Sequence, residues 1–286
     1  SSQQPLATDQ QFQVVAVADF DGNGAPDIVT GSNNGTAEIL LFQNDGAGNF
    51  TRSVLVNDLT PSGSSQGLRG LAVADLDGDG SPDLVAASNA LSWIDDEGPG
   101  PWPVVTLDNS PGTYFAAVQV ADFNRDGRTD IVDGGVGPTQ GFVEWRRNNG
   151  HLHDDSFQPH WTKFPIDQAP GREYRAVTPA DVDRDGQTDV VTGGAENGAG
   201  FVGWYRNLGT AGFGVRNVID QPAAPVNAVV AVDLDRDGSV DVVYASDSGL
   251  TFMRNADGAG GSWVSIPIAG VSGASSILAA DVDLDG

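Results

Sequence analysis

One acidic phrase recurs along this chain and constrains its fold more than any other feature. The copies read VADFDGNGAPDIV, VADLDGDGSPDLV, VADFNRDGRTDIV, PADVDRDGQTDVV, AVDLDRDGSVDVV and AADVDLDG. Their first aspartates, at positions 19, 75, 122, 181, 233 and 281, are 56, 47, 59, 52 and 48 residues apart. A repeat of this size indicates an array of similar structural units. The uneven spacing predicts that the differences in length lie in loops.

Each repeat has the pattern of four short strands separated by turns. In the first repeat, an apolar run ending at Phe20 is followed by the acidic phrase and then by apolar runs at 28–30, 37–42 and 50–56. No stretch has sustained helical spacing, and the chain contains 38 Gly and 16 Pro, which favours strands and tight turns. Four antiparallel strands per repeat are typical of a propeller blade, whose apolar faces are buried against its neighbours. We therefore predict an all-β fold, a β-propeller of four-stranded antiparallel blades.

The repeats predict a single propeller domain over residues 1–286. They begin near residues 12, 68, 115, 174, 226 and 275, so five blades are complete and a sixth has started. The sixth copy stops inside its acidic phrase at Gly286. We expect a domain that is incomplete at its C-terminus and belongs to a six- to eight-bladed ring. A closed five-bladed ring with one additional strand is the alternative.

The charge balance excludes two classes of partner. The chain has 14 Lys plus Arg against 39 Asp plus Glu, a formal net charge of −25. A protein of this sign is repelled by phosphate backbones and anionic headgroups, so we expect no nucleic-acid binding. No apolar run approaches the roughly 20 residues of a membrane span, and we expect no membrane insertion. Because there is no cysteine, stability must come from packing and bound metal.

The acidic phrase has the spacing of a calcium loop. Carboxylate or amide side chains stand at positions 1, 3, 5 and 9 of each of the five complete copies, counted from the first aspartate. Ca²⁺ binds six to eight hard oxygens at about 2.3–2.6 Å. If these residues only formed hairpin turns, every copy would hold carboxylates about 4 Å apart without a compensating charge. We predict five or six structural Ca²⁺ ions. The predicted ligands are Asp19, Asp21, Asn23 and Asp27; Asp75, Asp77, Asp79 and Asp83; Asp122, Asn124, Asp126 and Asp130; Asp181, Asp183, Asp185 and Asp189; Asp233, Asp235, Asp237 and Asp241; and Asp281, Asp283 and Asp285.

The third strand of each repeat carries a second recurring pattern. LLFQNDGAG, VEWRRNNG, VGWYRNLG and TFMRNADG share an order of aromatic or apolar residue, Asn and Gly, whereas LSWIDDEGPG departs from it and keeps only the aromatic Trp93. Together with the acidic copies, these segments resemble the calcium-binding repeats of integrin α-subunit propellers and of FG-GAP or VCBS repeat proteins. The resemblance covers essentially the whole chain. It implies that each acidic loop joins the first and second strands of a blade.

Calcium loops of this kind also bear on location. In extracellular modules they bind at about 10⁻⁴–10⁻³ M, a range that is filled outside cells. The loops therefore indicate a secreted or cell-surface protein. The first 11 residues lack a signal-peptide pattern, so we expect a mature or trimmed chain.

A candidate ligand face lies opposite the acidic loops. The resemblance places the connections between blades on that face, and planar aromatics beside Arg and Glu suit sugar stacking and bidentate recognition. The candidate residues are Arg69, Tyr114, Phe115, Arg172, Glu173, Tyr174 and Arg175. The alternative is that these residues only pack the strand entries.

Two further groups of side chains are conspicuous. All three histidines, His151, His153 and His160, fall in one insertion and could hold a transition metal. No helix or paired strand is evident there to fix the geometry, so a solvated hairpin tip is the favoured interpretation. Trp93, Trp145 and Trp204 occupy matching places in three repeats. We predict that these tryptophans pack between blades.

These features favour a non-catalytic propeller for adhesion or for recognition of a glycan or an extracellular protein. One alternative is a structural repeat module of a larger extracellular assembly, through self-assembly or as part of a longer parent chain. The other is the propeller of a polysaccharide lyase or a related sugar-converting enzyme. The sequence holds no nucleophile motif, phosphate loop or complete transition-metal signature, so we expect no catalytic residues.

Overall fold

The computed structural model describes residues 12–32, 37–57, 59, 67–96, 102–150, 161–271 and 273–280. These residues form strands almost throughout, and the helical structure among them is the 3₁₀ turn η1 (Gly209–Ala211). The described residues contain no helix that is long and apolar enough to span a membrane. The chain divides into two compact units, one formed by residues 1–120, 128–131 and 148–162, the other by residues 121–127, 132–147 and 163–286.

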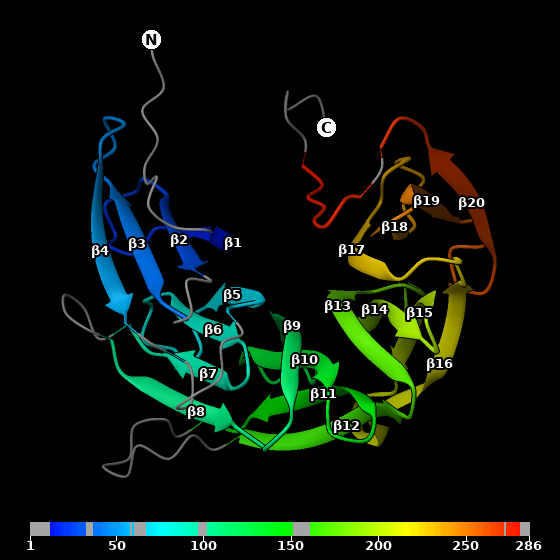
Figure 1. Ribbon diagram of the computed structural model, residues 1–286, viewed down its shortest axis with the longest axis horizontal. Helices are drawn as coiled ribbons and strands as arrows, with labels where there is room; N and C mark the ends of the chain where they lie inside the picture. The colour runs from blue at the N-terminus through cyan, green and yellow to red at the C-terminus, as the bar shows by residue number, and fades with distance from the viewer. Residues whose placement is uncertain are drawn as a thin grey trace. The chain divides into compact units, whose positions relative to one another are not determined.

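The described strands form five antiparallel sheets of four strands, which we call blades 1 to 5 (Figure 1). Blade 1 comprises β1 (Phe12–Ala18), β2 (Asp27–Ser32), β3 (Ile39–Asn44) and β4 (Phe50–Val56). Blade 2 comprises β5 (Gly70–Ala74), β6 (Asp83–Ala87), β7 (Leu91–Ile94) and β8 (Val104–Asp108). Blade 3 comprises β9 (Tyr114–Ala121), β10 (Asp130–Val136), β11 (Gly141–Asn148) and β12 (Trp161–Ala169). Blade 4 comprises β13 (Arg172–Ala180), β14 (Asp189–Glu196), β15 (Ala199–Asn207) and β16 (Phe213–Asp220), and blade 5 comprises β17 (Val226–Val232), β18 (Asp241–Ser246), β19 (Gly249–Asn255) and β20 (Trp263–Ile268).

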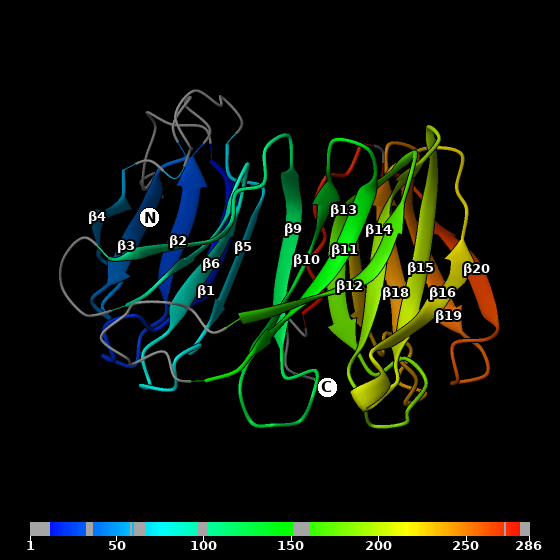
Figure 2. The same ribbon diagram turned by 90° about the horizontal axis from the view of Figure 1, so that it is seen from below.

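Within each blade, strands that follow one another in the sequence lie next to one another in the sheet (Figure 2). Such up-and-down order needs only short hairpin connections, which the Gly-, Asn- and Asp-rich turns supply. The predicted fold class, an all-β chain of four-stranded antiparallel blades, is confirmed for the described residues.

The middle strands of a blade are buried and the last strand is exposed. Every residue of β6 and β7 is buried, whereas β20 has exposed side chains from Val264 onward. A strand covered on both faces needs an apolar run rather than strict alternation, and DLVAA and LSWI have this character. The sequence pattern therefore separates the inner strands from the outer edge.

Blades 4 and 5 meet closely because small residues lie between them. A Cβ atom on Gly193 of β14 would lie 2.7 Å from the Cγ1 atoms of both Val226 and Val229 of β17. This distance is too short for a carbon contact, so glycine allows the first strand of blade 5 to approach β14. The result is a continuous core that includes Tyr244 and Trp204.

The prediction that tryptophans pack between blades is confirmed for Trp145 and Trp204. Trp145 stacks on Phe164 of its own blade and meets Phe213 of blade 4 edge-on, with a ring-centroid distance of 6.0 Å. Trp204 of blade 4 donates its Nε1–H to the carbonyl of Gly260 in blade 5, at 3.1 Å. These rings are buried, so they serve blade packing rather than ligand binding.

Candidate functional site

The acidic loop occupies the same place in every blade, between the first and second strands. In blade 2 it starts at Asp75, directly after β5, and ends at Asp83, the first residue of β6. The loops at 19–27, 122–130, 181–189 and 233–241 have the same bounds relative to their strands. This placement is the one that the repeat resemblance implied.

The glycine at position 6 closes each loop onto its first aspartate. Its φ lies between +83° and +95° in all five loops, a conformation that glycine adopts without steric cost. Its backbone N–H donates to Oδ2 of the position-1 aspartate at 2.8–3.0 Å in every loop. The repeated glycine therefore fixes the position-1 carboxylate.

The aspartate at position 9 is buried and held by two backbone amides. Its exposed fraction is at most 1% in all five loops. In blade 4, Oδ2 of Asp189 accepts from the N–H of Val182 at 2.9 Å and Oδ1 accepts from the N–H of Asn207 at 2.7 Å. A carboxylate has about four lone-pair sites, so two remain for another ligand.

Positions 1, 3 and 9 bring their carboxylates together in four loops. One oxygen from each residue lies within 4.8 Å of the others in the groups Asp19, Asp21 and Asp27; Asp75, Asp77 and Asp83; Asp181, Asp183 and Asp189; and Asp233, Asp235 and Asp241. The loop of blade 3 has Asn124 at position 3. Hard oxygens arranged around one point are the donor set that calcium prefers.

The position-5 carboxylate makes a hydrogen bond within its loop. Asp79, Asp185 and Asp237 are not among the three grouped carboxylates of their loops. Oδ1 of each accepts the N–H of the residue at position 7, at 2.7–2.8 Å, and this bond does not prevent the second oxygen from binding the predicted metal. The position-5 residue thus stabilises the turn of the loop.

Two of the acidic loops contain a buried oxygen without a partner. Oδ1 of Asp181 and Oδ1 of Asp233 are inaccessible to solvent and accept no hydrogen bond from any described residue. A buried acceptor without a partner costs about 1–3 kcal/mol, and more when it is charged. A cation between the carboxylates removes that cost, so the residues present fit a calcium ion.

The pKa values of the loop carboxylates agree with this fit. Burial raises the pKa of Asp83 to about 7 and that of Asp189 to about 7, while backbone hydrogen bonds offset part of the effect. Burial also raises the pKa of Asp183 and Asp241. These groups resist ionisation without a counter-charge, and a divalent cation reverses that preference.

An asparagine at the end of the third strand links successive loops, and sequence reasoning missed this role. Nδ2 of Asn207 donates to the carbonyl of Phe123 in the loop of blade 3, at 2.8 Å, and to that of Thr188 in its own loop, at 2.9 Å. Asn255 makes the same two bonds, to Val182 and Val240. The repeated Asn in RRNNG, YRNLG and MRNAD was the available signal, but it was interpreted only as part of a turn.

Several predicted residues lie outside the part of the chain that the structure describes. These are Asp281, Asp283 and Asp285 of the sixth copy and His151, His153 and His160 of the insertion. Their predicted roles stay predictions.

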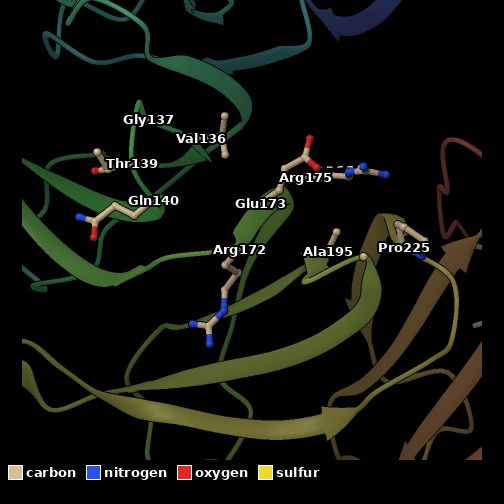
Figure 3. Close-up of a pocket in the computed structure, with 11 residues that line it drawn as sticks. Val136, Gly137, Thr139, Gln140, Arg172, Glu173, Arg175, Ala195 and Pro225 are labelled. Atoms are coloured by element: carbon tan, nitrogen blue, oxygen red, sulfur yellow. Dashed lines mark hydrogen bonds and ion pairs between the residues drawn. The ribbon is translucent and has the colours of Figure 1, made fainter.

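A second site lies in blades 3 and 4, at the opposite ends of the strands from the acidic loops. A pocket of about 390 Å³ is lined by Thr139 and Gln140 from the β10–β11 turn and by Arg172, Glu173 and Arg175 from the start of β13. Figure 3 shows Glu173 and Arg175 pointing together, whereas Arg172 points away from them. Three of the predicted ligand-face residues therefore gather at one pocket.

A β-bulge presents Arg175 to this pocket. The register of β13 on β14 shifts between Tyr174 and Ala176, and such bulges re-aim a side chain. Nη2 of Arg175 donates to Oε2 of Glu173 at 2.9 Å, and Nη1 donates to Oδ1 of Asn227 at 3.0 Å. The pocket thus has a positioned donor group beside a carboxylate acceptor.

The other predicted ligand-face residues differ in their surroundings, and Arg69 is exposed. Phe115 and Tyr174 have no exposed surface and cannot stack on a ligand. Arg69 lies over the ring of Tyr114, with its Cζ 5.7 Å from the ring centroid. Arg172, which lines the pocket, is held by Asp167 and Glu196, with Nη1 2.6 Å from the Asp167 carboxylate.

The Arg172 ion pairs belong to a larger network between blades 3 and 4. Oδ2 of Asp167 accepts the hydroxyls of Tyr205 and Tyr174 at 2.6 and 2.8 Å. Burial opposes ionisation of Asp167, but these hydroxyls and the Arg172 charge outweigh burial and lower its pKa. The hydrogen bond from Arg172 likewise lowers the pKa of Glu196.

The sequence matches one family model in three places. The model of the FG-GAP-like repeat covers residues 19–86, 181–243 and 233–286. No curated protein matches the chain.

Two solved structures are similar in fold. One is a lectin of Agrocybe aegerita that recognises non-reducing terminal N-acetylglucosamine, with 20% identity and a TM-score of 0.57 over 89% of this chain and 65% of that one. The other is the biofilm matrix protein Bap1 of V. cholerae, with 18% identity and a TM-score of 0.54 over 92% of this chain and 41% of that one. The chain thus spans less than two thirds of either protein.

The repeat model and the geometry agree on the same segments. Each matched stretch contains at least one complete acidic loop at the turn between a first and a second strand of a described blade. The model covers more than half of the chain, and the protein therefore belongs to the family of FG-GAP-like repeat proteins.

Proposed function

We propose that this protein is a calcium-stabilised, non-catalytic propeller module that recognises a glycan or a protein outside the cell. The observation that carries the proposal is the grouping of three carboxylates in four loops, two of which have a buried oxygen without a partner. Bound calcium would hold positions 1, 3 and 9 together, and folding would then be coupled to the metal. Loops of this affinity fill at extracellular rather than cytosolic calcium concentrations.

The pocket beside Glu173 and Arg175 is the proposed recognition site. A guanidinium and a carboxylate held 2.9 Å apart offer donors and acceptors to the hydroxyl and amide groups of a sugar. Thr139 and Gln140 add neutral polar groups on the other side. The lectin with a similar fold binds terminal N-acetylglucosamine, so glycans ending in this sugar are the first ligands to test.

The network of Tyr174 and Arg172 beside this pocket argues against an enzyme. Tyr174, one of the side chains able to act as a base, is fully buried, and burial raises its pKa to about 12. Arg172 is held by two carboxylates. These groups stabilise blade 4 and do not converge on a reacting atom.

The test of the proposal is thermal unfolding with excess EDTA and with millimolar Ca²⁺, using Mg²⁺ for comparison and calorimetry to count bound ions. One site filled at 100 times its Kd contributes about 2.7 kcal/mol. That contribution corresponds to a rise in Tm of at least about 5 °C for a chain of this size. A rise that is selective for calcium, with about five ions bound, is expected.

Matched variants separate loop binding from general charge effects. Asp233→Asn removes the position-1 carboxylate of blade 5 and should remove one calcium ion from the count. Asp257→Asn changes an exposed aspartate of the β19–β20 turn and should leave the count unchanged. Equal Tm values in EDTA and Ca²⁺ for the unsubstituted protein, with no bound ion, would contradict the proposal.

A further inference from the structure

A guanidinium already lies against the acidic loop of blade 4. Nε of Arg206 is 2.7 Å from Oδ2 of Asp183, and Nη2 is 2.9 Å from Oδ2 of Asp185. Asp183 is one of the three grouped carboxylates of that loop and has a side-chain exposure of 8%. Arg206 thus binds the position-3 carboxylate, which the calcium ion would also need.

The equivalent side chain of blade 5 behaves differently. Arg206 directly precedes the linking residue Asn207, and Arg254 directly precedes Asn255. Nε of Arg254 has no hydrogen-bond partner among the described residues. In the blade 5 loop, Arg184 lies 3.7 Å from Asp237, which is not one of the three grouped aspartates. In the described part of the chain, the two loops therefore differ in whether an arginine pairs with a grouped aspartate, as Arg206 does with Asp183.

The contact has opposite effects on the loop with and without metal. Three carboxylates within 4.8 Å repel one another, and a positive charge held among them relieves that repulsion. An arriving calcium ion must compete with Arg206 for Asp183 and is repelled by the guanidinium. The fork of two N–H groups makes Arg206 better suited to this than a lysine.

We propose that Arg206 is a built-in counter-ion of the blade 4 loop. It keeps this loop folded when calcium is scarce, and it makes the blade 4 site bind calcium more weakly than the blade 5 site. The inference rests on the proposed calcium function and assigns an order to the sites: blade 5 fills before blade 4. The module would then keep part of its structure over a range of calcium concentrations in which its sites are only partly filled.

The test is calcium titration calorimetry and metal-free thermal unfolding of Arg206→Gln, with Arg254→Gln as the matched control. Arg206→Gln should tighten the weakest class of site by about tenfold, because calcium affinity in such loops varies over decades with ligand charge. It should also lower the metal-free Tm. Arg254→Gln should change both quantities less, since Arg254 acts on Asp237 only through its charge and donates no hydrogen bond to the grouped aspartates of its loop among the described residues.

Two more variants keep the test decisive. Arg206→Lys restores the charge without the fork and should return part of the metal-free Tm. In the background of Asp183→Asn, Arg206→Gln should have no further effect on calcium affinity, because the residue for which both cations compete has lost its charge.

The outcomes distinguish this inference from the proposed function. Calcium binding by the unsubstituted protein with unchanged affinity in Arg206→Gln would overturn the inference and leave the calcium function standing. A metal-free Tm that does not fall in Arg206→Gln would overturn the counter-ion role. Absence of calcium binding in every variant would overturn both.

Discussion

The two ends of blade 4 are built on different principles. At the acidic-loop end, the bonds repeat from blade to blade: position 6 to position 1, position 2 to position 9, and the linking asparagine to the preceding loop. At the other end, Asp167, Arg172, Tyr174, Tyr205 and Glu196 form a network of hydrogen bonds and ion pairs between blades 3 and 4. We call the acidic-loop end the repeated end, because its bonds recur from blade to blade. We call the opposite end the particular end, because its network is described between blades 3 and 4.

The two ends of the blade differ because they meet different structural requirements. The loops must place carboxylates around one point, and a single geometry meets that need in every blade. The opposite end has only to join two blades and present a surface, which many side-chain combinations can do. Repetition therefore marks the candidate metal loops, and variation marks the candidate recognition site.

The largest expected effect is at the repeated end. Asn207→Ala would leave the carbonyls of Phe123, which is buried, and Thr188, which is partly buried, without their side-chain donor. At about 1–3 kcal/mol for each orphaned group, we expect a loss of about 2–4 kcal/mol in the free energy of unfolding, measured by urea denaturation in EDTA. Asn217→Ala is the control, because its amide makes one long bond of 3.5 Å, and it should change stability by less than about 0.5 kcal/mol.

If Asn207→Ala were as mild as Asn217→Ala, the repeated bonds would not stabilise the loops. The loop end would then owe its order to metal alone. Repeating both measurements in calcium separates these contributions, since the linking bonds and the metal act on the same loops.

A smaller effect is expected in the network at the other end. Tyr205→Phe removes a hydroxyl 2.6 Å from Oδ2 of Asp167, and a hydrogen bond to a charged group contributes about 1.5–3 kcal/mol. The folded-state pKa of Asp167 is lowered, so its stabilisation is present above the unfolded pKa of about 3.9 and is lost as pH falls through the folded value. The loss from Tyr205→Phe should therefore be full at pH 7 and shrink below a pH of about 4.

Urea denaturation of both proteins at several pH values tests this sign. Loop carboxylates titrate in both proteins, so the difference between them isolates the network. Tyr244→Phe removes a separate hydroxyl, 2.7 Å from Asp220, and serves as the matched control for losing one Tyr–Asp bond. A loss in Tyr205→Phe that grows as the solution becomes more acidic would contradict the assignment.

The residues that form the acidic loops could be predicted from the sequence. The residues that form the pocket at the opposite end could be predicted only in part. The position-1, position-3 and position-9 aspartates were found by spacing, because each copy restates the same requirement. The turn bonds of position 5 were not foreseen: Asp79, Asp185 and Asp237 have the spacing of a ligand, and each also accepts a backbone N–H of its loop. Spacing identifies which residues enter a loop and does not reveal which backbone amide each carboxylate meets.

The ligand face illustrates a different limit. The motif GREYR placed Arg172, Glu173, Tyr174 and Arg175 at one strand entry, but alternation along a strand cannot foresee a bulge. The bulge at Arg175 presents this residue to the pocket beside Glu173, while Tyr174 is fully buried. Arg206 also escaped notice, because its contact with Asp183 joins residues 23 positions apart.

The smallest expected change in stability is at the pocket beside Glu173 and Arg175. A small change there is informative, because it separates a role in ligand binding from a role in the fold. Glu173 and Arg175 are 39% and 32% exposed, and an ion pair in such a position contributes about 0–1 kcal/mol. Glu173→Gln and Arg175→Gln should therefore leave the free energy of unfolding nearly unchanged while abolishing any signal on a glycan array run in calcium. Asn217→Ala, on β16 and outside the pocket lining, should retain that signal. Loss of both stability and glycan signal would mean that the Glu173–Arg175 pair stabilises the fold. Retained glycan binding in both pocket variants would mean that recognition occurs at another site. The particular end of blade 4 would then have a packing role alone.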